Sequence, residues 1–315
     1  MTINIPPIGV LLMSYGGPDS LDDLPGYLAD IRSGRPTGRA VLEEMRHNYT
    51  LVGGKSPLLE FSRKQAAALE KQLNQNGDYF KVYLGMRHWA PWIEETIREM
   101  LADGIEQAVA LVLAPHYSRF NSERFYQKIA EGLALYHGDI RFEYIKSHHT
   151  APKYIEALAK RVHLGISRWS EEAQEGVHVL FSAHSLPVRI LKMGDPYQEQ
   201  LFETVRLVVE KAGLKPEQWS WSYQSAGRSP EPWLGPSIEE QLQALAGKGI
   251  KGVVSLPVGF VCDNVEILFD IDLKAQEAAK SLGIRLERPP ALNDDPLYIE
   301  ALATLILENS SVGSR

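Results

Sequence analysis

The chain of 315 residues contains a single cysteine, Cys262. One thiol cannot form an intramolecular disulfide, and it cannot supply an iron–sulfur cluster or a metal site built from several cysteines. No apolar run approaches the roughly 20 residues that a membrane-spanning helix needs. The opening residues, Met1 to Pro7, show no basic segment followed by an apolar stretch, so we expect no signal peptide. These absences favour a protein of the cytoplasm, where thiols stay reduced.

The sequence also lacks a surplus of positive charge. It has 33 lysines and arginines against 40 acidic residues, a net charge of −7, so we expect no nucleic-acid partner. An anionic substrate would need a local basic patch. We find no G-x-G-x-x-G, Walker, G-x-S-x-G or H-E-x-x-H motif. Their absence argues against a nucleotide-dependent enzyme, a serine hydrolase and a zinc peptidase of those types.

Short apolar runs alternate with longer segments of helical spacing. This alternation predicts parallel sheets with helices on both faces, an α/β fold. The runs with the length of strands are 8–15, 80–86, 108–115, 140–145, 177–182, 219–224, 252–257 and 285–288. The segments of helical spacing are 56–73, 92–102, 153–162, 196–212, 238–246 and 266–282.

Four strands followed by four more predict two similar Rossmann-like domains, each a parallel sheet flanked by helices. We place the first in residues 1–150 and the second in residues 151–295, with a cleft between them. A last helix, 296–309, could fold back on either domain, and packing on the first is one of these alternatives.

The most informative segment is Val179-Leu-Phe-Ser-Ala-His-Ser-Leu-Pro187, an apolar run that ends at His184. Open α/β sheets bind ligands at the carboxyl ends of their strands. His184 therefore binds a metal, transfers a proton or simply caps its strand, and the pattern alone favours none of these. Other strand ends also carry polar or aromatic residues. These residues are Tyr15, Arg87, His88 and His116. A turn is the simpler interpretation for the Tyr15 motif, and a hydrogen-bonded structural histidine is the simpler one for His88 and His116.

A second group of polar residues follows the run at 252–257. Asp263 and Glu266 have the spacing of a capping box, by which Glu266 would only cap its own helix. Alternatively, Glu266 and Asp270, four residues apart, share one helix face. Two carboxylates there are typical of a hard oxygen site or a proton relay. A histidine nitrogen and a carboxylate together suit ferrous iron or zinc in transit.

A local basic surplus lies near the N-terminal end, within residues 32–55. For most of these side chains a solvated helix face is the simpler interpretation. The functional alternative is a clamp for carboxylates, which guanidinium groups bind in a bidentate manner. The residues are Arg32, Arg35, Arg39, Arg46 and Lys55.

Seven motifs, in order along almost the whole chain, resemble those of ferrochelatases. They begin at Leu12, Val52, Ser182, Gly194, Tyr223, Pro232 and Pro257 and read LMSYGGP, VGGKSP, SAHSLP, GDPY, YQS, PWLGP and PVGF. The resemblance implies chelatase-type domains around a porphyrin cleft and insertion of Fe²⁺ into a porphyrin. It implies no nucleotide, no iron–sulfur cluster and no cofactor beyond the iron substrate. We expect a monomer, with other enzymes of the haem pathway as possible partners.

The resemblance also implies roles for individual residues. His184 and Glu266 would form the metal-side catalytic pair, with Asp270 on the proton exit path, and Tyr15 would ligate the iron of the product. Arg87 and His88 would support the site. The porphyrin and its propionates would be bound by Arg32, Asn48, Tyr49, Ser56 and Tyr126.

Tyr15 and the short, arginine-rich segment after it resemble the coproporphyrin ferrochelatases of Gram-positive-type bacteria. Coproporphyrin III carries four propionates, which favour a polar, cationic rim, so coproporphyrin III and Fe²⁺ are the expected substrates. A protoporphyrin IX ferrochelatase and a non-catalytic haem carrier remain alternatives. The chain departs from the family pattern at Asn48, Asn264 and Lys274. Lys274, which replaces an acidic residue, argues against an outer regulatory metal site.

Overall fold

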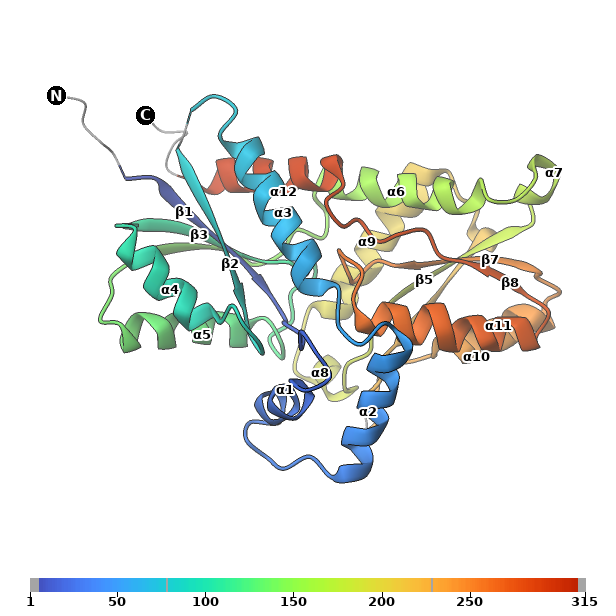
Figure 1. The fold of residues 1–315 in the computed structure, drawn as a ribbon. Coiled ribbons are helices and arrows are strands. Elements are labelled where there is room, and N and C mark those ends of the chain that lie inside the picture. The colour runs from blue at the N-terminus through green and yellow to red at the C-terminus, as the bar shows by residue number, and fades with distance from the viewer. Residues whose placement is uncertain (1–5, 78, 228, 311–315) are drawn as a thin grey trace. The chain divides into compact units, whose positions relative to one another are not determined.

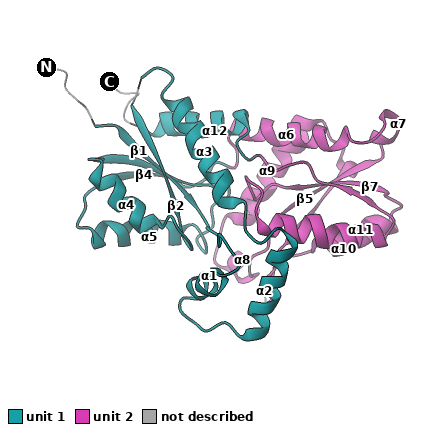
Figure 2. Cartoon of the chain, viewed as in Figure 1, with its two compact units in different colours: residues 1–148, 293–315 teal, residues 149–292 magenta. Residues whose placement is uncertain are grey.

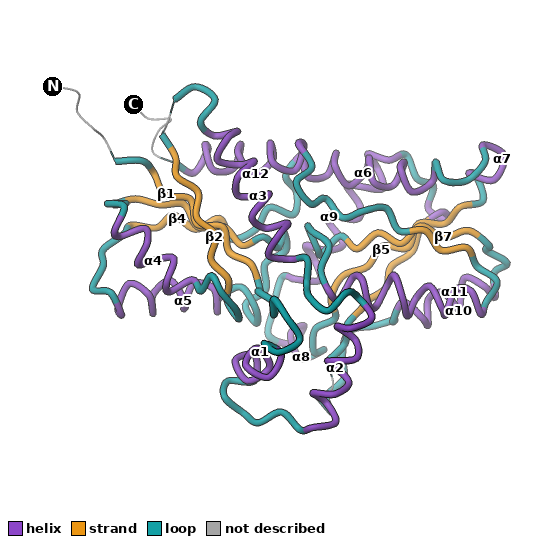
Figure 3. Tube along the Cα trace, viewed as in Figure 1, coloured by secondary structure: helices purple, strands orange, loops and turns teal. Residues whose placement is uncertain are grey.

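The structure is a computed structural model, and it describes residues 6–77, 79–227 and 229–310. Most of the segment inspected for a signal peptide therefore lies outside the described residues. The chain divides into two compact units, residues 1–148 with 293–315 and residues 149–292 (Figure 2). Each unit contains one four-stranded parallel sheet (Figure 3). The predicted α/β fold of two similar Rossmann-like domains is confirmed.

In the first unit the strand order is β2-β1-β3-β4 (Figure 1). Helices α3 and α12 cover one face of the sheet, and α4 and α5 cover the other. Helices α1 and α2 contact each other and lie outside these layers. The strands are β1 (Ile8–Ser14), β2 (Phe80–Met86), β3 (Gln107–Val112) and β4 (Arg141–Ile145). The helices are α1 (Leu24–Ile31), α2 (Arg39–Leu51), α3 (Leu58–Leu73), α4 (Ile93–Ala102), α5 (Glu123–Leu135) and α12 (Pro296–Asn309).

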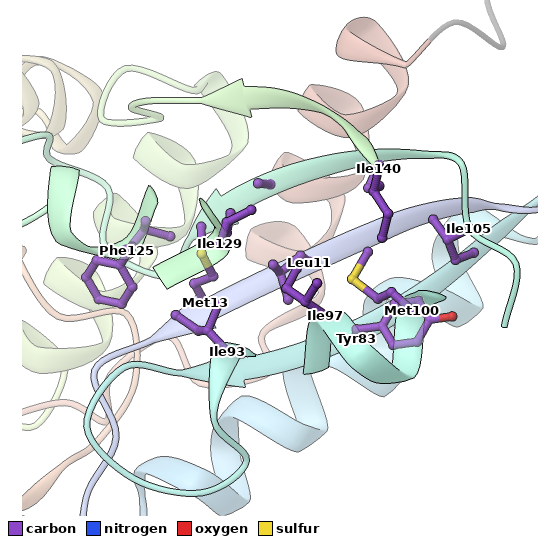
Figure 4. Packing of buried hydrophobic residues seen from close by; sticks show 13 residues of the cluster. Leu11, Met13, Tyr83, Ile93, Ile97, Met100, Ile105, Phe125, Ile129 and Ile140 are labelled. Atoms are coloured by element: carbon purple, nitrogen blue, oxygen red, sulfur yellow. The ribbon is translucent and has the colours of Figure 1, made fainter. Parts of the chain in front are cut away.

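The central strands are apolar along their whole length because helices cover both faces of the sheet. In β1 every residue after Ile8 is buried. On one face Leu11 and Met13 pack against Ile93 and Ile97 of α4 and against neighbouring strands (Figure 4). This cluster anchors β1, whose carboxyl end leads directly into Tyr15.

The second unit repeats the topology with the strand order β6-β5-β7-β8. Helices α6 and α9 pack together on one face, and α10 and α11 lie on the other (Figure 1). The strands are β5 (Val177–His184), β6 (Trp219–Gln224), β7 (Gly252–Pro257) and β8 (Arg285–Glu287). The helices are α6 (Pro152–Ile166), α7 (Glu171–Gln174), α8 (Arg189–Lys192), η1 (Pro216–Gln218), α9 (Tyr197–Ala212), α10 (Ile238–Gly247), η2 (Ile267–Ala275) and α11 (Gln276–Ser281).

The helix predicted over 266–282 differs from expectation in its type. Its first part, η2, is a π-helix with i→i+5 hydrogen bonds, and only the later part, α11, is α-helical. π-Helical turns are rare in proteins overall, and those that occur often lie at functional sites. This one begins directly after Glu266. No helix among the described residues is long and apolar enough to cross a membrane.

Candidate active site

His184 is the last residue of β5, two residues beyond the strand end predicted from the sequence. In the parallel ladder it pairs with Gln224, the last residue of β6. The next residue is held firmly, because the Ser185 backbone N–H donates to the Gln224 carbonyl (2.7 Å) and its Oγ donates to the Leu234 carbonyl (2.7 Å). The Tyr197 hydroxyl donates to the His184 carbonyl (2.9 Å). The histidine therefore stands on a rigid strand end.

The hydrogen bonds of His184 fix its neutral tautomer. Nδ1 lies 2.5 Å from the carbonyl oxygen of Ser185, and a carbonyl only accepts, so Nδ1 carries the proton. Nε2 then holds the lone pair in the neutral ring, and it lies 3.7 Å from Oε2 of Glu266. Both side chains are partly exposed, at 33% and 40%. The structure therefore brings together the two residues predicted as the metal-side pair, with a basic nitrogen facing a carboxylate.

Glu266 does not act as the partner in a capping box, so that interpretation is wrong. The cap is Asn264, whose Oδ1 accepts from the backbone N–H groups of Glu266 (2.9 Å) and Ile267 (3.2 Å). The Asp263 carboxylate instead binds Arg288 (2.7 Å). Because Asn264 supplies the side-chain cap of this helix, the Glu266 carboxylate is left to face His184.

The segment before this helix packs closely on β5. The Val258 N–H donates to the Ser182 carbonyl (2.9 Å), which extends the β5–β7 ladder beyond β7. At Gly259 a Cβ would lie 2.9 Å from the Ala183 Cβ, closer than real side chains approach. Phe260 then packs edge-on against the His184 ring, with centroids 6.4 Å apart. A glycine is therefore needed at this position for the approach to the metal-side histidine.

Asp270 takes different partners from Glu266. Its carboxylate accepts a hydrogen bond from the Ser225 hydroxyl, and Oδ1 lies 3.8 Å from the Lys274 ammonium. Lys274 also lies 3.6 Å from Glu239. Burial raises the pKa of Asp270, while Ser225 and Lys274 oppose that rise. Asp270 thus follows Glu266 by four residues and lies next to Lys274, which also approaches Glu239 of α10.

The pKa of Glu266 is shifted in the same direction as that of Asp270. Desolvation by the surrounding protein raises its pKa, the charge of His184 opposes the rise, and nearby Asp270 adds to it. The Glu266 side chain is 40% exposed, so it can exchange protons with its surroundings. A carboxyl group with a raised pKa is able to take up and release a proton closer to neutral pH.

In the first unit Tyr15 directly follows β1. Its ring is 36% exposed and packs on His88, with centroids 4.6 Å apart. Next to it Gly16 has φ +93°, and a Cβ there would lie 2.9 Å from the backbone nitrogen of Trp89. The positive φ of Gly16 is the conformation for which a glycine is suited, and no hydrogen-bonded turn is formed over residues 15–18, so the phenol simply follows the end of the strand.

Arg87 and His88 lie behind Tyr15. The guanidinium of Arg87 is buried, stands 5.4 Å from the centre of the Tyr15 ring, and donates to Oδ1 of Asn121 (2.5 Å). His88 Nδ1 binds Asp30 (2.6 Å). Burial and the neighbouring Arg87 lower the pKa of His88 to about 4, although Asp30 acts in the opposite direction, so this imidazole is neutral near pH 7.

The five predicted porphyrin contacts lie on separate segments of the first unit. Arg32 ends α1 and is exposed, whereas Tyr49 in α2 is only 1% exposed and its neighbour Asn48 is partly buried. Ser56 Oγ accepts the backbone N–H two residues further on, at the start of α3. Tyr126 packs edge-on against a tyrosine of β4, and its buried hydroxyl has no hydrogen-bond partner among the described residues.

Several residues that complete these sites could not be recognised in the sequence. Each touches a predicted residue from a distant position in the chain: Asp30 touches His88, Asn121 touches Arg87, and Ser225 touches Asp270. Within residues 6–77, 79–227 and 229–310, no three or more histidine, cysteine, aspartate or glutamate side chains are grouped so that they could hold a metal ion. His184 and Glu266, the predicted metal-side pair, are therefore not part of a larger group of this kind among those residues.

Known proteins of similar sequence and fold show which class of protein this chain belongs to. The family model described as Ferrochelatase matches residues 7–310. The ferrochelatase of Deinococcus radiodurans is 59% identical over 303 residues, 96% of each chain, and the coproporphyrin III ferrochelatase of Geobacillus sp. WCH70 is 39% identical over 96% of this chain and 97% of its own. The crystal structure of the sirohydrochlorin chelatase SirB from Bacillus subtilis superposes with a TM-score of 0.58 at 12% identity, covering 98% of both chains.

The SirB likeness shows a chelatase-type fold, which fits two parallel-sheet units that each carry functional side chains at a strand end. Within that class, the chain belongs to the ferrochelatase family. It is an enzyme that inserts a metal into porphyrin in haem synthesis.

Proposed function

We propose that the enzyme inserts Fe²⁺ into coproporphyrin III, giving Fe-coproporphyrin and two protons. The observation that carries the metal-insertion part is the 3.7 Å approach of His184 Nε2 to Glu266 Oε2 at the end of β5. One imidazole and one carboxylate suit Fe²⁺. So few ligands also allow the metal to leave again, which a site that hands on its metal requires.

The same pair is suited to take up the protons that the porphyrin loses. The lone pair on His184 Nε2 would accept a pyrrole proton, since Nδ1–H is already held by the Ser185 carbonyl. Glu266 would receive protons next, because its raised pKa suits transfer near neutral pH. Asp270, further along the helix, would pass them toward the surface.

Tyr15 is the proposed oxygen ligand to the iron of the product. A tyrosine oxygen is a known type of haem ligand. The buried guanidinium of Arg87 lies 5.4 Å from the centre of the ring and holds the ring in place by a cation–π contact. The neutral His88 packs on the ring without adding a competing charge.

The assignment of coproporphyrin III is supported by the segment from α1 to α2. Helix α2 buries only Tyr49, and Arg32, Arg35 and Arg39 on this segment are exposed. Exposed guanidinium groups suit a tetracarboxylate better than a porphyrin with two vinyl groups. The Geobacillus relative, named as a coproporphyrin III ferrochelatase, also supports this assignment. We further propose that the enzyme works in the cytoplasm as a monomer, and its one buried thiol, Cys262, suits a reducing compartment.

The test is anaerobic Fe²⁺ insertion with coproporphyrin III and protoporphyrin IX side by side. We expect faster turnover with coproporphyrin III. Equal or faster turnover with protoporphyrin IX would overturn the substrate assignment, and binding of either porphyrin without turnover would indicate a carrier. His184→Ala should lower turnover by about 10²- to 10⁴-fold, the usual contribution of a general base, while porphyrin binding, followed by fluorescence, remains. Wild-type turnover by this variant would refute the role of His184.

A further inference from the structure

The guanidinium of Arg288 lies just after β8 and is almost completely enclosed. Its side chain is 10% exposed, and Nε and Nη2 each lie 2.6 Å from one oxygen of Asp272. Its Nη1 lies 2.7 Å from Asp263 Oδ1 and also donates to the Pro289 carbonyl (3.2 Å). One arginine thus forms a bidentate pair with one carboxylate and a single bond to another.

The two carboxylates lie on either side of Glu266 in the sequence. Asp263 precedes it by three residues, in the segment that leads into the helix, and Asp272 follows it by six, within η2. Asp263 is 13% and Asp272 31% exposed, so both bonds are shielded from water. Charge-assisted bonds of this kind are stronger than neutral ones and have a defined direction. Together they tie both ends of the segment that carries Glu266 to the chain after β8.

We infer that Arg288 is a positioning residue that holds the Glu266 carboxylate in place opposite His184. The inference rests on the role proposed above for Glu266. Because the bonds from Arg288 reach Asp263 before Glu266 and Asp272 after it, they restrict the movement of the turn that carries the Glu266 carboxylate. Arginine is suited to this task because its planar fork binds one carboxylate in a bidentate manner and still has an N–H group for another, whereas a lysine cannot form the bidentate pair.

The test compares three variants in the Fe²⁺ insertion assay with coproporphyrin III. Arg288→Met should lower kcat about 10- to 100-fold, the usual effect of losing a residue that orients a ligand. Arg288→Lys should recover part of this loss. Arg285→Met is the matched control, because Arg285 lies three residues earlier and pairs with Glu287 (2.9 Å) rather than with the helix. It should keep turnover close to that of the wild type.

Porphyrin affinity separates positioning from general damage. The coproporphyrin dissociation constant of Arg288→Met, measured by fluorescence, should stay within about twofold of the wild-type value while kcat falls. If Arg288→Met does not fold, Asp272→Ala and Asp272→Asn replace it. The alanine variant should lose turnover, whereas the asparagine variant, which still accepts hydrogen bonds, should retain most of it.

The outcomes distinguish this inference from the proposed function. The inference would be overturned if Arg288→Met, or Asp272→Ala in its place, turned over as fast as Arg285→Met. It would also be overturned if the variant lost porphyrin affinity by the same factor as kcat. Glu266→Gln is measured in the same assay. If Glu266→Gln loses turnover and Arg288→Met does not, only the inference fails. If Glu266→Gln keeps full turnover, the proposed role of Glu266 fails, and the inference fails with it.

Discussion

His178 and His184 lie on the same strand, and only His184 belongs to the proposed catalytic pair. His178 is 5% exposed, and its Nε2 lies 2.9 Å from the Ser220 hydroxyl. Burial is the largest influence on this imidazole and lowers its pKa to about 4, although a backbone hydrogen bond at Glu217 acts in the opposite direction. We therefore predict that His178 makes the folded protein sensitive to acid and that His178→Gln reduces this sensitivity.

The magnitude follows from the difference between the folded and unfolded pKa values. The ordinary value is 6.5 and the folded value about 4, so the unfolded chain binds the proton more readily throughout that interval. At about 1.4 kcal/mol for each pKa unit, the stability lost when the pH falls below both values is about 3 kcal/mol, of which about 2 kcal/mol is lost by pH 5. The contribution is fully present above pH 6.5.

The assay is urea unfolding of the wild type and of His178→Gln at pH 8 and pH 5. The free energy of unfolding should fall less between the two pH values in the variant, by about 2 kcal/mol. Fe²⁺ insertion at pH 8 should be unchanged, because His178 lies at the opposite end of β5 from His184. An equal loss in both proteins would refute the assignment of a neutral, buried imidazole at His178.

Three further changes test the surroundings of the metal-side pair. Lys274→Met removes the ammonium that lies 3.8 Å from Asp270, and this loss raises the pKa of Asp270 further. The acid limb of the pH–rate profile should therefore move to higher pH. An unmoved limb would exclude Asp270 from the proton path. Asn264→Ala removes a helix cap and should lower the free energy of unfolding by about 1 kcal/mol in urea, and no loss would contradict the capping role. Gly259→Ala places a Cβ 2.9 Å from that of Ala183. It should lower kcat about 10-fold or more by displacing the segment that packs on β5 before Glu266. An unchanged kcat would show that this segment adapts.

The strands could be predicted from the sequence because buried parallel strands are apolar along their length. Each of the eight predicted strands is present, with ends that differ by at most three residues. Helix α2 was not predicted, although Leu42, Met45 and Tyr49 follow one another at helical spacing; in the structure it buries only Tyr49. Helix α5 does show such a pattern, with Phe125, Ile129 and Gly132 buried on one side, so it could have been recognised.

The metal-side pair could be predicted only in part from local pattern. His184 stands out as the polar end of an apolar strand, but the spacing of Asp263 and Glu266 indicated a cap. That prediction was wrong because Arg288, 25 residues further on, binds Asp263, and Asn264 caps the helix instead. Contacts between residues so far apart depend on the tertiary fold, and a single sequence gives no sign of them.

The strand orders β2-β1-β3-β4 and β6-β5-β7-β8 are the same arrangement used twice. Tyr15 follows the second strand in the first order, and His184 ends the second strand in the other, so the two residues occupy corresponding places in two copies of one scaffold. In a duplicated scaffold each copy can exchange the residue at this place while the other copy keeps its own. In the proposed function one copy supplies an oxygen donor and the other a nitrogen donor. Engineering a new metal or tetrapyrrole preference can therefore treat the two strand ends as separately adjustable positions.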